Sequence, residues 1–133
     1  MPAKLSKYRK HPEQDLQKAV VQFLACAVPP PPVGPFWFAP DPGVQAGGQH
    51  AARIGGIRKA MGVRPGVADL VFLRPNPFCI ELKAGRNSLD APQRIVMAEL
   101  NNLGIHTHVV RSIDQLVVVL QAENVPMRAE VLA

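Results

Sequence analysis

The sequence predicts a single α/β domain in which helices flank a central mixed β-sheet, with the element order αβ(α)ββαβα. Amphipathic patterns with helix-capping residues alternate with short runs of β-branched and aromatic residues. The length of 133 residues suits one domain with a modest core. Hydrophobic residues make up 47% of the chain, yet no apolar run is long enough to span a membrane, so we expect a soluble protein.

The N-terminal segment MPAKLSKYRKH is basic, and we assign residues 1–11 to a tail outside the domain. It lacks the apolar stretch that follows the charges of a secretory signal, so we expect a cytoplasmic protein with no membrane partner. Cys26 and Cys79 have no paired cysteine or histidine neighbours, which argues against a zinc site or a disulfide framework. We expect both thiols to lie in the core.

The first helix is expected in HPEQDLQKAVVQFLACAV, where proline occupies the first turn and apolar residues recur at helical spacing. These apolar residues are Leu16, Val20, Phe23, Leu24 and Ala27. Glu13 falls on the same side of the helix as Val20 and Leu24. An acidic residue in the first turn can simply complement the helix dipole, and from this helix alone we favour that interpretation.

Residues 29–50 are rich in proline and glycine, so we expect a loop with one short strand, FWFA. A helix is expected over about residues 51–61, before the turn GVRPG. This helix presents Arg53, Arg58 and Lys59. They form either a phosphate-contacting cluster or an ordinary solvated face, and the sequence favours neither.

Capping and turn signals define the remaining elements. Two strands, ADLVFLR and FCIELK, flank a Pro-Asn-Pro turn and should pair as a hairpin. The helix in SLDAPQRIVMAELNNLG starts at its N-cap Asp90 and stops at Gly104. We expect its apolar side to comprise Ile95, Val96, Leu100 and Leu103. The strand IHTHVV and a helix capped by Ser112 complete a domain over residues 12–122, which leaves residues 123–133 as a tail.

The hairpin carries three charged residues where apolar residues otherwise predominate. Side chains alternate along a strand, so Glu81 and Lys83 project from the same face. With so short a turn, Asp69 falls opposite residues 81–83. Two carboxylates held close repel one another unless a cation neutralises them, and Mg²⁺ does so with oxygen ligands. The alternative is a surface Glu81–Lys83 pair worth about 0–1 kcal/mol, with Asp69 as a turn residue.

His106 and His108 share one face of the predicted strand IHTHVV. Two histidines at this spacing can form a metal site or supply a general base. Because no third ligand is recognisable for them in the sequence, we favour a plain sheet-face pair.

Four features occur in order along the chain: a helix with Glu13, the strand start GVADL at residues 66–70, the ELK strand at residues 81–83, and a helix beginning near Gln93. This arrangement resembles the VRR-NUC branch of the PD-(D/E)XK nuclease superfamily over nearly the whole chain. The resemblance implies a restriction-endonuclease-like fold. Ala68 stands where the family has the proline of its PD pair, a residue that shapes the strand start and ligates no metal.

The resemblance also implies a set of metal ligands. Asp69 and Glu81 would hold Mg²⁺, for which Mn²⁺ can substitute. The backbone carbonyl of Leu82 would be a further ligand, and Glu13 would complete the shell or bind a second ion. No small-molecule cofactor is implied.

Two more residues receive catalytic roles from the resemblance. Lys83 would position the attacking water and stabilise negative charge on the phosphate, and Gln93 would orient the water or contact a phosphate. The implied activity is metal-dependent, structure-specific cleavage of DNA, for example at four-way (Holliday) junctions. The alternatives are a non-catalytic DNA-binding module of the same fold and a restriction-like enzyme that reads sequence.

The net charge of +5 favours an anionic partner, which agrees with DNA. We expect DNA contacts from Arg53, Arg58, Lys59, Arg64 and Arg86. Cutting two strands of a junction with one site per chain favours a homodimer. The stretch from Pro29 to Pro42 could hold an arm against the partner, or it could pack on its own core.

Overall fold

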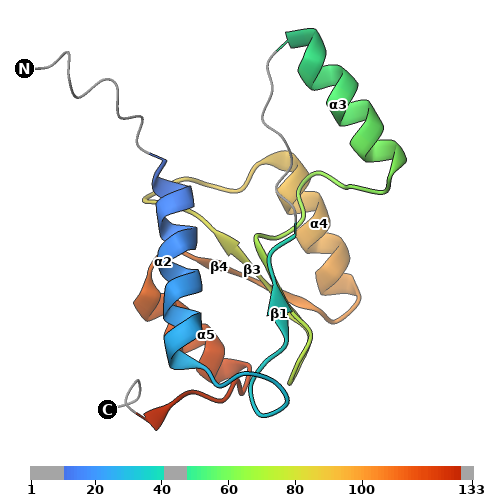
Figure 1. The fold of residues 1–133 in the computed structure, drawn as a ribbon. Helices are drawn as coiled ribbons and strands as arrows, with labels where there is room; N and C mark the ends of the chain where they lie inside the picture. Colours follow the sequence, from blue (N-terminus) through green and yellow to red (C-terminus); the bar gives the residue numbers. More distant parts are fainter. Residues whose placement is uncertain (1–10, 41–47, 130–133) are drawn as a thin grey trace, which may run out of the picture.

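The computed structural model describes residues 11–40 and 48–129, and it shows a four-stranded mixed sheet with helices on both faces (Figure 1). The helices are α2 (Pro12–Ala27), α3 (Gly48–Ala60), α4 (Ala91–Asn102) and α5 (Ile113–Ala122). The strands are β1 (Trp37–Phe38), β2 (Leu70–Phe72), β3 (Phe78–Leu82) and β4 (His106–Val110). The predicted α/β class and element order are confirmed. None of the helices in these ranges has the length and apolar character of a membrane span.

The strands lie in the order β1-β2-β3-β4. β1 pairs with β2 and β2 with β3 in antiparallel fashion, whereas β3 and β4 are parallel. α4 forms the crossover that a parallel pair requires. Leu70 lies opposite Ile80, which lies opposite His108 on its other side. β3 is therefore an interior strand, and all of its residues are buried.

The main core lies between the sheet and the pair of helices α2 and α5 (Figure 1). Its members with no exposed surface are Val20, Leu24, Leu70, Phe72, Phe78, Ile80, Val110, Leu116 and Leu120. Burial of each such side chain contributes about 1.5–3 kcal/mol. Since Phe78 and Ile80 point into this core, alternation turns Cys79 and Glu81 to the opposite face, where α4 lies.

α4 packs on that opposite face through a narrower stripe than predicted. Val96 is buried and Leu100 is half-buried, but Ile95 is 57% exposed and Leu103 is 74% exposed. Residues at i and i+4 share one line along a helix, and the line of Val96 and Leu100 faces the sheet, with Gln93 and Met97 beside it. The expectation that Ile95 and Leu103 belong to the packed side is therefore wrong.

α2 buries the side that its spacing predicts, with Val20, Leu24 and Ala27 in the core. Cys26 is exposed, contrary to the expectation that it is a core residue, because the rotation of the helix carries it away from that side. Cys79 is buried within β3, as expected.

The proline-rich stretch packs on its own chain as far as residue 40. Pro35 is fully buried, and β1 pairs with β2 of the same sheet. The Trp37 ring stacks on Phe72 with 6.1 Å between ring centroids. Residues 29–40 are therefore tied to their own sheet through Pro35 and β1, and residues 41 and 42 lie outside the described ranges.

The core extends past residue 122, where we expected the domain to end. Val125 is 5% exposed and belongs to the core, and Met127 packs against it. The backbone N–H of Arg128 donates to the carbonyl of Ala27 at 2.7 Å. The segment after α5 thus closes over the end of α2.

Candidate functional site

Asp69 and Glu81 meet across the β2–β3 pair. Leu70 lies opposite Ile80, so the preceding Asp69 falls across from Glu81 on the α4 face of the sheet. The N–H of Leu82 donates to Oδ2 of Asp69 at 2.7 Å, which fixes the Asp69 side chain directly before the start of β2. The predicted convergence of these two carboxylates is confirmed.

The Asp69–Glu81 pair is electrostatically unsatisfied. Glu81 is only 3% exposed. Burial raises the pKa of Glu81 from 4.5 to about 8, with further upward contributions from the charge of Asp69 and a hydrogen bond with it. The charge of Lys83 lowers this pKa in part, and that of Asp90 raises it slightly. Without a cation, the raised pKa of Glu81 therefore favours the protonated form of this carboxyl at neutral pH.

Lys83 follows directly after β3 and lies on the same face of the sheet as Glu81. Its N–H donates to the carbonyl of Val110 at 3.1 Å, which extends the pairing of β3 with β4 by one residue. The side chain is buried, with the whole residue 7% exposed. The structure thus brings Asp69, Glu81 and Lys83 together and excludes the alternative of a solvated surface pair.

Gln93 holds Glu81 instead of facing open space. Its Nε2 donates to Oε1 of Glu81 at 2.7 Å, while its own Oε1 accepts the N–H of Asp90 at 3.0 Å. Asp90 caps α4 as predicted and accepts the N–H of Gln93, which completes a capping box. Both ends of the Gln93 amide are engaged, so this side chain orients the Glu81 carboxylate.

Gly66 allows α4 to approach the start of β2. Its φ is +84°, a conformation that other residues rarely adopt. A Cβ at this position would lie 2.4 Å from both the carbonyl carbon and the carbonyl oxygen of Pro92, and 2.8 Å from the nitrogen of Gln93. This close backbone contact sets the start of α4, and with it the position of Gln93 relative to Glu81.

Glu13 is half-buried in the first turn of α2 and accepts a hydrogen bond of 3.1 Å from Nδ2 of Asn87. Asn87 lies in the loop that follows Lys83. Arg111, which directly follows β4, holds this loop in place. Its guanidinium donates to the carbonyls of Gly85 at 2.9 Å and Asn87 at 2.7 Å. Glu13 is therefore tied to the loop beside the site, through Asn87, and this hydrogen bond does not bring it to the Asp69–Glu81 pair itself.

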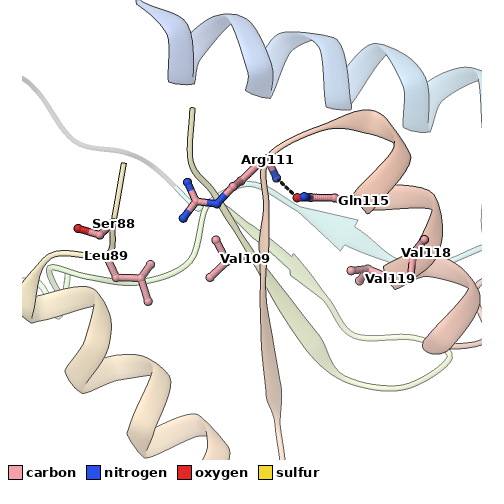
Figure 2. Close-up of a pocket in the computed structure, with 7 residues that line it drawn as sticks. All are labelled: Ser88, Leu89, Val109, Arg111, Gln115, Val118 and Val119. Carbon is pink, nitrogen blue, oxygen red and sulfur yellow. Dashed lines mark hydrogen bonds between the residues drawn. The ribbon is translucent and has the colours of Figure 1, made fainter. Parts of the chain in front are cut away.

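An open hollow lies beside the end of β4 and α5 (Figure 2). It is lined by Ser88, Leu89, Val109, Arg111, Gln115, Val118 and Val119. Val109 pairs with Glu81, and Leu89 also lines a narrow crevice that contains Glu81 and Gln93. Sequence reasoning missed Asn87 and Arg111 as site residues, although a polar loop directly after the ELK strand was a signal that could have found the first of them.

The basic residues predicted to contact DNA lie in three places. Arg53 and Lys59 are exposed and Arg58 is half-exposed on α3, which projects away from the sheet (Figure 1). Arg86 is exposed on the loop after β3, close in sequence to Lys83. Arg64 instead pairs with Glu99 of α4 at 2.6 Å, so its charge is partly compensated.

Comparisons of the chain with protein families, with curated proteins and with solved structures give no match. The functional conclusion therefore rests on the geometry and chemistry of the residues themselves.

Proposed function

We propose that the protein is a metal-dependent DNA endonuclease of the VRR-NUC branch, with a restriction-endonuclease-like fold. The observation that carries the proposal is the directly opposed carboxylate pair Asp69–Glu81, of which Glu81 is buried and Asp69 half-buried, with the buried Lys83 on the same face. Placing three charged groups together in and beside the protein interior is costly unless the arrangement serves a purpose. A non-catalytic binding module has no need of this arrangement.

The residues present fit Mg²⁺. Burial first, and then the charge of Asp69, raise the pKa of Glu81, and a hard divalent cation with oxygen ligands would stabilise the charged form of this carboxylate. Asp69 and Glu81 would hold the ion together with the carbonyl of Leu82, and Glu13 would join through the loop that it already contacts. When bound, the ion supplies Lewis acidity toward the phosphate and lowers the pKa of water, and Mn²⁺ can take its place.

The chain contributes charge and orientation. Lys83 places a compact ammonium beside the carboxylates, where it can position water and stabilise the negative charge that develops on phosphate oxygens. Gln93 fixes the Glu81 carboxylate through a 2.7 Å hydrogen bond and is a positioning residue. Arg111 positions the loop that carries Arg86, a residue exposed to contact the DNA backbone.

A cleavage assay with labelled four-way junction, flap and linear DNA tests the proposal. Wild-type protein with Mg²⁺ should cut, and Asp69→Asn, Glu81→Gln or Lys83→Ala should reduce the rate by a factor on the order of 10² or more. Asp114→Asn, an exposed carboxylate in the first turn of α5, is a matched control that should keep full activity. Full activity in excess chelator would contradict the metal mechanism, and DNA binding without any cleavage would indicate a binding module.

A further inference from the structure

Three side chains of metal-ligand type meet where β4 begins and α5 ends. His106 and His108 project from β4, and Glu123 directly follows α5. Oε1 of Glu123 lies 2.7 Å from Nε2 of His108 and 3.5 Å from Nδ1 of His106. The potential ligand atoms all lie within 4.8 Å of one another. Glu123 is the third ligand that the sequence did not reveal for the histidine pair.

The backbone holds these side chains in place. In the register of β3 and β4, His106 lies opposite Phe78 and His108 lies opposite Ile80. The His108 ring packs edge-on against Phe78, with 5.9 Å between centroids. The N–H of Glu123 donates to the carbonyl of Val119 at 2.9 Å, so the end of α5 fixes the carboxylate. The cluster is therefore largely formed before any ligand arrives.

The cluster combines burial with access. The side chain of Glu123 is 11% exposed, whereas that of His106 is 70% exposed. The polar partners that the structure shows for this buried carboxylate are the two imidazoles. A carboxylate in such a setting gains from a cation that its neighbours can help to bind, and one side of the cluster is open for that cation to enter.

We propose that His106, His108 and Glu123 form a Zn²⁺ site. Two imidazoles and one carboxylate are a ligand set that zinc accepts, and a tetrahedral ion with bonds of about 2.0–2.1 Å separates its ligand atoms by roughly 3.3 Å. The His106–Glu123 separation of 3.5 Å is already near that value, and the His108–Glu123 separation of 2.7 Å has to lengthen by about 0.6 Å. Water occupies the fourth position on the exposed side.

This site is separate from the Asp69–Glu81 pair and does not depend on the proposed nuclease function. His106 lies opposite Phe78, the first residue of β3, whereas Glu81 lies near the other end of that strand. His108 contacts Phe78 of the α2/α5 core, and Glu81 faces α4. The chemistry also differs, because imidazole nitrogen selects zinc and related metals while a pair of carboxylates suits Mg²⁺.

Titration of the full chain with Co²⁺ and with Zn²⁺, in the presence of excess Mg²⁺, tests the site. Co²⁺ should give a visible absorption spectrum with a stoichiometry of one ion per chain, and Zn²⁺ should displace it. His106→Gln should weaken binding by about tenfold or more, and because the His106 side chain is largely exposed this variant should fold. His11→Gln and Cys26→Ser, which alter an exposed histidine and an exposed cysteine elsewhere, should bind as the wild type does.

Thermal unfolding gives a second measurement. Saturating Zn²⁺ should raise the Tm of the wild type and of Glu81→Gln by an amount on the order of 5 °C, but not that of His106→Gln. The Tm should rise because the bound ion would link the end of α5 to β4. Absence of Zn²⁺ binding in the wild type, or equal binding by His106→Gln, would overturn the proposal and leave a hydrogen-bonded cluster only.

Discussion

The side-chain amide of Gln93 donates a 2.7 Å hydrogen bond to Oε1 of Glu81, and this bond connects the first turn of α4 to the interior strand of the sheet. The same amide accepts the N–H of the helix cap Asp90. One side chain therefore belongs both to the capping of a helix and to the orientation of a buried carboxylate.

Gln93→Ala should separate these two roles. Loss of the capping interaction should cost about 1 kcal/mol of stability, and loss of the bond to Glu81 should raise the Mg²⁺ concentration needed for half-maximal cleavage. Gln115→Ala is the matched control, because Gln115 occupies the same position in α5 but its side chain accepts from the N–H of Arg111. A similar stability loss in both variants with no change in Mg²⁺ requirement for Gln93→Ala would reduce Gln93 to a capping residue.

The pKa of Glu81 predicts how the stability of the metal-free protein depends on pH. Because the folded-state pKa is about 8 and the ordinary value is 4.5, the stabilisation is fully present below about pH 4.5 and is lost as pH rises through about 8. In chelator, the contribution of this group should therefore lower the Tm progressively over that window. In Glu81→Gln, the fall of Tm with rising pH that is due to this group should disappear. Mg²⁺ added at pH 8 should restore the stability of the wild type. The same pH profile in wild type and Glu81→Gln would contradict the assignment.

The exposed basic residues of α3 predict the salt dependence of DNA binding. Replacement of both Arg53 and Lys59 by alanine should reduce the log–log slope of affinity against salt by about 0.9 for each phosphate that these side chains neutralise on duplex DNA. Lys18→Ala, which removes an exposed charge from α2, should leave the slope nearly unchanged. If the double replacement also has no effect, α3 presents only a solvated face.

We expect the protein to assemble as a homodimer that makes paired cuts in a four-way junction. A single chain carries one Asp69–Glu81 pair, and closed two-fold symmetry is the commonest way to present two. Light scattering should give twice the chain mass, and the junction should be cut faster than linear duplex. A monomer mass at all concentrations, or equal rates on both substrates, would argue against this arrangement.

Local rules made much of the site predictable from sequence. Strand alternation and a short hairpin turn are sufficient to bring Asp69 opposite Glu81. The caps Asp90 and Ser112 are likewise determined by the residues next to them in the chain, and both are confirmed.

Contacts between distant segments were not predictable. The bond from Gln93 to Glu81 requires α4 to dock at one particular depth on the sheet, which its apolar spacing does not specify. Glu123 reaches His108 across 15 positions only because α5 folds back along β4, and in the sequence it looked like the start of a tail. The error at Cys26 has a different origin, because helical spacing from Val20, Leu24 and Ala27 already turns this residue away from the buried side and only its residue type suggested the core.

Gly66 has no side chain, and the geometry at this position restricts which amino acids can replace it during evolution. The smallest possible enlargement, a single methyl group, would collide with the Pro92 carbonyl and would also occupy a strained φ. The collision would displace the start of α4 and thereby the amide that holds Glu81. Position 66 should consequently tolerate no other amino acid in a lineage that keeps the chemistry, and a drift away from glycine there would mark descendants in which the pair of carboxylates has lost its use.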